Sequence, residues 1–171
     1  LEHQLMQARA RVLMDPSAQS RRRLQELDAE AASAPSRDRL GALYASATAS
    51  MLLRDFVRAE RAWADGARQG VAALGPEEAR ARQAWALLGA ELALEQGDTA
   101  SAAQRLGATA DIITRPEMLL RAQVAVANGQ PEALRRQAEL LQAWVSEHRQ
   151  DAAAWSALSQ CADRLGQKLR A

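Results

Sequence analysis

The stretch Gln96-Gly97-Asp98-Thr99 interrupts the chain between two apolar segments, each long enough to form a helix. Similar breaks occur at Leu53-Arg54-Asp55-Phe56, Asn128-Gly129-Gln130-Pro131 and Leu165-Gly166-Gln167-Lys168. Aligned on their second residues, the four breaks lie 43, 32 and 37 positions apart. A recurrence of this length is typical of stacked helix pairs, in which each unit buries its apolar face against its neighbours. We therefore expect an α-solenoid, a fold that binds partners along an extended surface.

The composition also indicates an all-α protein. Of the 171 residues, 48% are hydrophobic but only 4% are aromatic, so alanine and leucine make up most of the apolar mass. Both residues have high helix propensity. No stretch alternates apolar and polar residues over the length of a strand. A chain of this length has room for one domain of about ten helices.

The breaks and the prolines together predict the helix boundaries. Pro16, Pro76, Pro116 and Pro131 each stand where a helix can begin, since the first turn does not need their missing N–H. The predicted helices cover residues 1–14, 17–33, 37–53, 55–70, 77–96, 99–110, 116–128, 131–148, 152–165 and a last segment from about 167.

Short connections make consecutive helices antiparallel, which groups them into pairs. We expect a single TPR-like domain over residues 1–171, with approximate pairs at 1–33, 37–70, 77–110, 116–148 and 152–171, the last one truncated. Helical stripes support this assignment. In the helix at 131–148, for example, the apolar residues Leu134, Ala138, Leu141 and Val145 share one face, which a neighbouring helix must cover.

Charge and hydropathy argue against two classes of partner. The net charge is +1, from 22 basic and 21 acidic residues, so neutralisation of nucleic-acid phosphates is not expected. The densest basic run, Arg21-Arg22-Arg23, is followed by acidic residues and is interpreted as a solvated helix face. No run approaches the ~18 apolar residues needed to cross a bilayer, so direct membrane insertion is not expected either. The chain begins at Leu1 without an initiator methionine, and it looks like a fragment of a longer protein.

Several residues resemble the tetratricopeptide (TPR) repeat, which has a large residue and a leucine in its first helix, then a glycine turn and an alanine in its second. The last unit matches at Trp155, Leu158, the small residues Ser159 and Ala162, Gly166 and Ala171. An earlier unit matches over its second half, at Phe56, Ala59 and Trp63, and a middle unit matches at Ala90, Ala93 and Ala102. The resemblance implies a TPR-like superhelix that binds proteins or peptides.

A narrower resemblance covers the whole chain. The opening residues 2–13 and the closing residues 151–160 are similar to the C-terminal TPR domain of BepA-type, HtpX-related bacterial zinc metalloproteases. The family implies a periplasmic module that docks substrates or the outer-membrane protein assembly machinery. Its zinc ligands lie on an HExxH helix in a separate protease domain. This chain has no HExxH, so the resemblance implies no catalytic residue, no metal ligand and no cofactor here.

The residues that commonly carry chemistry have simpler structural explanations in this sequence. His148 is expected to cap a helix end at the surface, and His3 has the same interpretation. The only cysteine, Cys161, is expected to be a small core side chain. The tryptophans Trp63, Trp85, Trp144 and Trp155 are expected to fill the core between alanine-rich helices, since each offers a large area to bury.

If the chain binds a partner, the first helix of each pair is expected to line a concave binding face. The candidate residues on that face are Tyr44, Thr48, Met51, Glu91, Gln123, Gln160 and Arg164. Aromatic and methionine side chains suit adaptable contacts with an extended peptide. For Tyr44 a second interpretation stays open, in which its ring packs against Phe56 of the same pair.

Two other functions stay open at this stage. The chain could be a free-standing TPR adaptor or chaperone-type scaffold instead of the TPR module of a metalloprotease. It could also be an all-α enzyme, although it has no paired His or Cys residues and no glycine-rich phosphate loop. The sequence predicts neither the identity of the partner nor the oligomeric state.

Overall fold

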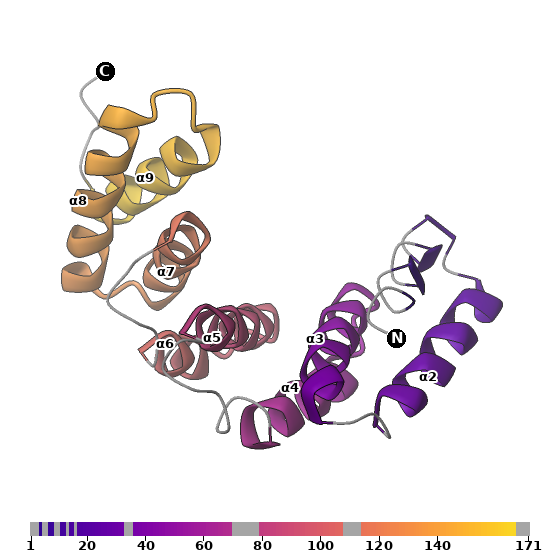
Figure 1. Cartoon of the computed structure of the whole chain (residues 1–171). Coiled ribbons are helices and arrows are strands. Elements are labelled where there is room, and N and C mark those ends of the chain that lie inside the picture. The colour runs from indigo at the N-terminus through magenta and orange to yellow at the C-terminus, as the bar shows by residue number, and fades with distance from the viewer. Residues whose placement is uncertain are drawn as a thin grey trace. The chain divides into compact units, whose positions relative to one another are not determined.

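The computed structural model describes residues 4, 7–8, 11–12, 14–15, 17–32, 36–69, 79–107 and 114–166. All regular secondary structure in these residues is helical, so the prediction of an all-α chain is confirmed (Figure 1). Eight helices have defined bounds there: α2 (Ala18–Ala32), α3 (Ser36–Leu52), α4 (Phe56–Gln69), α5 (Ala79–Glu95), α6 (Thr99–Gly107), α7 (Arg115–Asn128), α8 (Pro131–Glu147) and α9 (Ala152–Arg164).

These bounds agree with the predicted ones to within three residues. Of the predicted first helix, the described residues Gln4, Gln7, Ala8, Arg11, Val12 and Met14 are helical. The predicted last helix, from about residue 167, lies outside the described residues, as does His3. The number of ten helices and the solenoid arrangement therefore remain predictions.

The four breaks share one backbone conformation. Their second residues, Arg54, Gly97, Gly129 and Gly166, have φ values of 57°, 77°, 67° and 66°. This left-handed conformation ends a helix and favours glycine, which has no Cβ to clash. At the second break, the N–H of Asp98 donates to the carbonyl of Ala93 at 2.9 Å, which closes the helix end. The recurrence seen in the sequence is thus a repeated helix-ending turn.

Arg54 is the one non-glycine residue of the described chain with a positive φ. The N–H of Asp55 donates to the carbonyl of Ser50 at 2.9 Å, as at the glycine turns. The Arg54 guanidinium also lies over the ring of Phe56, 5.6 Å from its centroid. This cation–π contact offsets part of the cost of a left-handed arginine.

Contacts along the chain divide it into two compact units, Leu1–Leu92 and Ala93–Ala171. The boundary falls inside α5, within the predicted pair 77–110. The prediction of one domain with five helix pairs remains a prediction.

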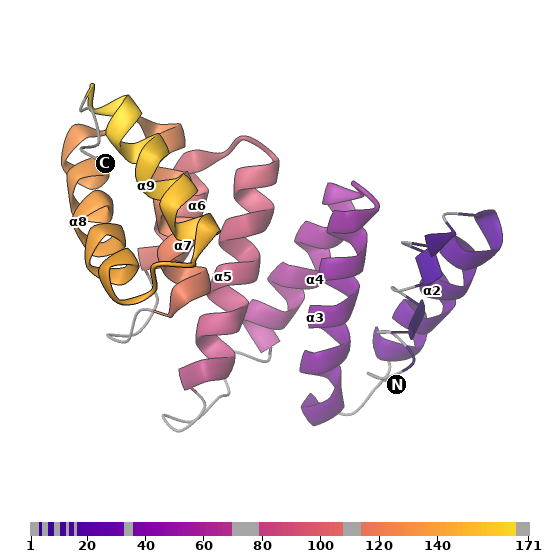
Figure 2. The ribbon, with the colours of Figure 1, turned by 90° about the horizontal axis from the view of Figure 1, so that it is seen from above.

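In the first unit, α3 packs against both α2 and α4 (Figure 2). Two clusters of buried apolar side chains hold these helices together. One cluster joins Ala8 and Val12, which precede α2, to side chains of α2 and α3. Its members are Ala8, Val12, Leu24, Leu27, Ala42, Ala45 and Ala49. The other joins α3, α4 and α5, and consists of Leu43, Ala47, Ala62, Trp85 and Leu88.

Two tryptophans connect α4 and α5 by a reciprocal contact. Trp63 Nε1 donates to the carbonyl of Trp85 at 3.0 Å, and Trp85 Nε1 donates to the carbonyl of Trp63 at 3.1 Å. Gly66 lies against the Trp85 indole, and Gly89 lies against the Trp63 indole. A Cβ at either glycine would overlap the indole beside it. The two glycines therefore let each indole reach the backbone of the opposite helix.

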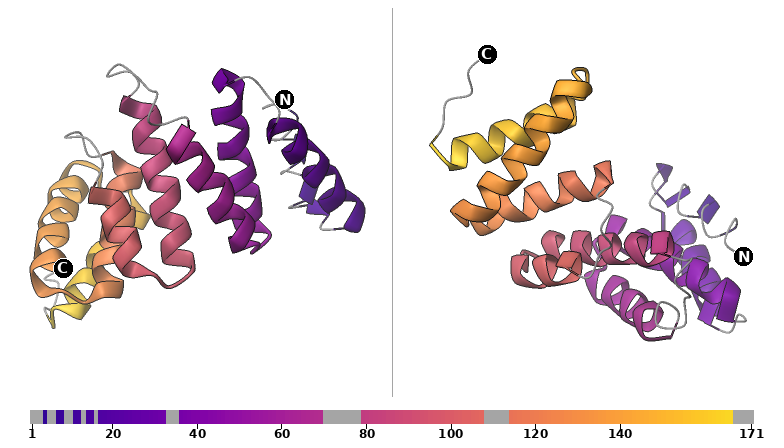
Figure 3. Two further views of the ribbon diagram at one scale, coloured as in Figure 1. Left: turned by 90° about the horizontal axis from the view of Figure 1, so that it is seen from below. Right: turned by 60° about the vertical axis from the view of Figure 1, so that its left-hand side comes forward.

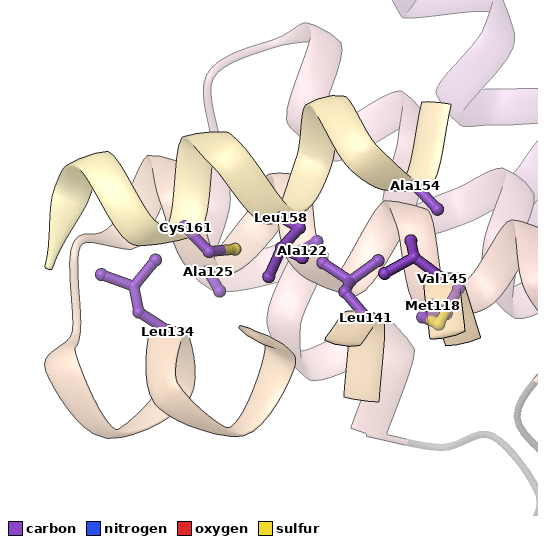
Figure 4. Packing of buried hydrophobic residues seen from close by; sticks show 9 residues of the cluster. All are labelled: Met118, Ala122, Ala125, Leu134, Leu141, Val145, Ala154, Leu158 and Cys161. Atoms are coloured by element: carbon purple, nitrogen blue, oxygen red, sulfur yellow. The ribbon is translucent and has the colours of Figure 1, made fainter. Parts of the chain in front are cut away.

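In the second unit, α7 packs against α6, α8 and α9, and α8 also packs against α9 (Figure 3). Figure 4 shows the apolar cluster among α7, α8 and α9. The predicted stripe on α8 is confirmed, since Leu134, Leu141 and Val145 are buried and Ala138 is half-buried. Cys161 is buried in this cluster, as predicted, and burial raises the pKa of its thiol.

Candidate partner-binding surfaces

Three of the predicted binding residues lie on α3, in the first unit. Tyr44 is 37% exposed and packs against Trp85 of α5, with ring centroids 5.7 Å apart. Thr48 is half-buried, and its hydroxyl donates to the carbonyl of Tyr44 at 2.7 Å. Met51 is half-buried against the α3–α5 cluster. These side chains contribute to packing and also keep some surface that a partner could contact.

The other four predicted residues are exposed. Glu91 lies on α5, Gln123 on α7, and Gln160 and Arg164 lie on α9. In the second unit α7 and α9 are in direct contact, so Gln123 and Gln160 belong to neighbouring helices. Gln123 is flanked along α7 by the half-buried apolar residues Leu119 and Val126, which pack against the core.

Each unit also has a groove that the sequence did not indicate. In the first unit, α2, α3 and α4 form a groove of about 450 Å³, and the 76% exposed side chain of Val57 stands at it. In the second unit, α8 and α9 form a groove of about 650 Å³ with Leu158, Ala162 and Leu165 along one wall. None of the seven predicted residues lines either groove.

Asp151 joins the beginning of α9 to α7 and α8. Arg115, the first residue of α7, donates to both of its carboxylate oxygens, from Nε at 2.6 Å and from Nη2 at 2.7 Å. Trp144 Nε1 of α8 donates to the same carboxylate at 2.9 Å. The backbone N–H of Ala154 donates to it at 3.2 Å, which makes Asp151 the N-cap of α9. The carboxylate thus joins α7, α8 and α9, of which α7 carries Gln123 and α9 carries Gln160.

These hydrogen bonds favour the ionised carboxylate. The Arg115 guanidinium, followed by the Trp144 indole, holds the pKa of Asp151 well below its usual range. A depressed pKa contributes stability above the unfolded-state pKa, which is about 3.9 for aspartate. That contribution is lost as the pH falls below about 4 toward the folded-state pKa.

The Asp151→Asn variant is therefore expected to be less stable than the original protein at pH 7, and the difference should shrink as the pH falls below about 4. Urea unfolding at a series of pH values measures it. Asp163→Asn, at an exposed carboxylate on the same helix, is the control and should not reproduce this pattern. A difference that stays constant from pH 7 to pH 2 would rule out the ionic role of Asp151.

His148 lies beside this junction, at the end of α8. Its ring stacks on Trp144 with centroids 3.9 Å apart and planes 8° apart. Its Nδ1 lies 3.1 Å from the carbonyl of Trp144. His148 is the C-cap of α8 and is exposed, so the prediction of a surface cap is confirmed.

The prediction that all four tryptophans fill the core is wrong for Trp155. Trp85 is buried and Trp63 and Trp144 are half-buried, but Trp155 is 41% exposed. The core positions of α9 are Ala154, Leu158 and Cys161, spaced four and three residues apart. Trp155 lies one residue, about 100°, away from that stripe, and its Nε1 donates to the carbonyl of Arg149 at 3.0 Å.

A buried ion pair lies within α7, and the sequence did not indicate it. Glu117 is fully buried, and Arg121 Nε donates to its Oε1 at 2.8 Å. Arg121 Nη2 donates to the carbonyl of Leu106, in the last turn of α6, at 2.6 Å. The i, i+4 spacing of Glu117 and Arg121 is visible in the sequence, but their burial is not.

The described residues contain no group of three or more His, Cys, Asp or Glu side chains that could hold a metal ion. In the same part of the chain, no helix is both long enough and apolar enough to cross a membrane. Comparisons with family models, with curated proteins and with solved structures find no match to this chain.

Proposed function

We propose that this chain is a non-catalytic protein-interaction module with TPR-like helix pairs. By its resemblance to the BepA-type family, it belongs to a periplasmic metalloprotease and docks substrates or outer-membrane assembly partners. Zinc belongs only to the protease domain that this resemblance implies. A free-standing TPR adaptor remains the alternative, and an all-α enzyme is the least favoured function.

The pattern of helix contacts carries this proposal. In a TPR-like stack, the first helix of a pair contacts its own partner, the preceding helix and the first helix of the next pair. In the second unit α7 has these contacts, with α8, α6 and α9 respectively. In the first unit α3 packs on α2 and α4, and its Leu43 and Ala47 share a cluster with Trp85 of α5.

The exposure of polar residues on these first helices supports the same proposal. Gln123 on α7 and Gln160 on α9 point to solvent although their helices contribute to the core. Repeat proteins bind partners through such surface positions, which the packing does not constrain. Glu132 offers a comparison, because it is also an exposed polar residue but lies on α8, the second helix of its pair, and outside the α8–α9 groove.

Photo-crosslinking in cells of the source organism tests the proposal. A photoreactive amino acid at Gln123 or Gln160 is expected to crosslink the chain to another polypeptide, and the same probe at Glu132 is expected to give at least fivefold less product. Mass spectrometry of the crosslinked bands then identifies the partner. Equal yields from all three positions, or none, would count against docking through the first helices.

The coding sequence upstream of Leu1 separates the two interaction hypotheses. An HExxH-bearing domain there supports the metalloprotease module. A start codon or a signal peptide immediately before Leu1 supports the free-standing adaptor instead.

A further inference from the structure

A small pocket in the second unit lies between α6, α7 and α8, apart from the seven predicted binding residues. Its volume is about 200 Å³. Leu106, Val124 and three alanines form its apolar walls, and Arg121, Asn128, Arg136 and Gln137 are its polar lining. An apolar pocket with a few convergent polar groups is the usual form of a specific binding site.

Gln137 is the side chain that indicates a ligand. It is only 9% exposed, and its Oε1 has no hydrogen-bond partner. Buried polar atoms are almost always hydrogen-bonded, because an unsatisfied one costs about 1–3 kcal/mol. The terminal torsion of glutamine is broad, so rotation about the Cγ–Cδ bond can turn the amide oxygen toward a group in the pocket.

The lining selects among ligand chemistries. A group that satisfies Gln137 Oε1 must donate a hydrogen bond, which a carboxylate cannot do. An ammonium group can donate, but the guanidinium group of Arg136 repels it, whereas Glu117 already neutralises Arg121. Arg121 already donates to Glu117 and to the carbonyl of Leu106, whereas the exposed Arg136 remains available as a donor. The remaining choice is a neutral group that both donates and accepts.

We propose that this pocket binds a primary carboxamide, the group at the end of asparagine and glutamine side chains. Its N–H donates to Gln137 Oε1, and its carbonyl accepts from Arg136. The methylene next to the amide packs against Leu106 and Val124. The carboxamide comes either from a docked polypeptide or from a free small molecule. The first of these sources rests on the proposed function.

Three three-carbon probes of similar size test the proposal by NMR titration of the ¹⁵N-labelled chain. Propionamide is expected to give saturable shifts that centre on residues of α6, α7 and α8 around the pocket. Propionate and propylammonium are expected to bind at least tenfold more weakly. Gln137→Leu, which keeps the volume but removes the acceptor, should weaken propionamide binding about tenfold, the effect of one hydrogen bond.

Gln142→Leu on the exposed face of α8 is the matched control and should bind propionamide as the original protein does. Arg136→Gln gives a second test and should also weaken propionamide binding, because it removes the guanidinium that donates to the amide carbonyl. Arg136 is exposed, so its replacement leaves the core intact. Equal binding of the three probes overturns the proposal, and so does unchanged propionamide binding by Gln137→Leu. A lack of saturable binding also overturns it and indicates hydration of the pocket only.

Two capped peptides distinguish the sources. Acetyl-Ala-Ala-Gln-Ala-Ala N-methylamide presents one primary carboxamide, and the same peptide with leucine at the centre presents none. Binding of the glutamine peptide more than tenfold tighter than propionamide assigns the site to a polypeptide. Binding no tighter than propionamide assigns it to a free amide. Crosslinking from Gln123 does not depend on this pocket, so the two proposals can fail separately.

Discussion

Replacing Arg121 with methionine is expected to destabilise the Ala93–Ala171 unit by about 3–5 kcal/mol. The change leaves the fully buried Glu117 carboxylate without its guanidinium partner. It also removes the donor to the carbonyl of Leu106. Methionine retains the apolar part of the arginine stem, so the loss reports mainly on the missing charge. Urea unfolding followed by circular dichroism measures the change.

Two variants test whether the buried charge is the cause. Arg135→Met removes an exposed arginine from α8 and should change the stability by less than about 0.5 kcal/mol. The double variant Glu117→Leu/Arg121→Met removes both charges and should recover most of the stability lost in Arg121→Met. A double variant as unstable as the single one would show that the other contacts of Arg121, including its bond to the Leu106 carbonyl, and not the charge left on Glu117, explain the loss.

Replacing Trp85 with alanine is expected to cost about 3–5 kcal/mol in the free energy of unfolding of the Leu1–Leu92 unit. Trp85 is 3% exposed and packs with Leu43, Ala47 and Ala62. Its indole fits against Gly66 and donates to the carbonyl of Trp63. Truncation leaves a large cavity between α3, α4 and α5, which the surrounding backbone can fill only in part. Urea or thermal unfolding measures the loss.

Trp155→Ala is the matched control, because it removes the same side chain from a partly exposed site. We expect it to cost about half as much or less, since less apolar area leaves the core. The Gly66→Ala variant adds a second check on the same contact. It should destabilise the protein with Trp85 present and be tolerated once Trp85 is replaced by alanine. Equal losses from Trp85→Ala and Trp155→Ala would contradict the packing of the Trp85 indole against α4.

Much of the secondary structure could be predicted because its signals are local. Four turns were found from their residues alone, and each has a left-handed residue in the structure, including Arg54, which is not a glycine. The apolar stripe on α8 could be found from its spacing, since the helix period fixes which side chains share a face. Cys161 and His148 could be placed for the same reason.

The candidate site was less predictable. The spacing of residues along a helix shows which side chains share a face, but not which helix covers that face. Tyr44 therefore has Trp85 as its aromatic contact, a residue of α5, although the sequence offered Phe56 of the same pair. Trp155 shows the same limit, because one residue of register separates a core position from an exposed one.

The sequence by itself determined that the described part of this protein is all-α, and it determined to within three residues where α2 to α9 begin and end. The helical class and the helix ends depend on residue propensities and on turns whose hydrogen bonds join residues only a few positions apart. Only the tertiary structure decided which side chains meet across helices. It brought Arg115 into hydrogen-bonding contact with the Asp151 carboxylate, 36 residues away. It also brought the indoles of Trp63 and Trp85 to each other's backbone carbonyls on the neighbouring helix. Such contacts depend on how whole helices pack, which no local pattern encodes.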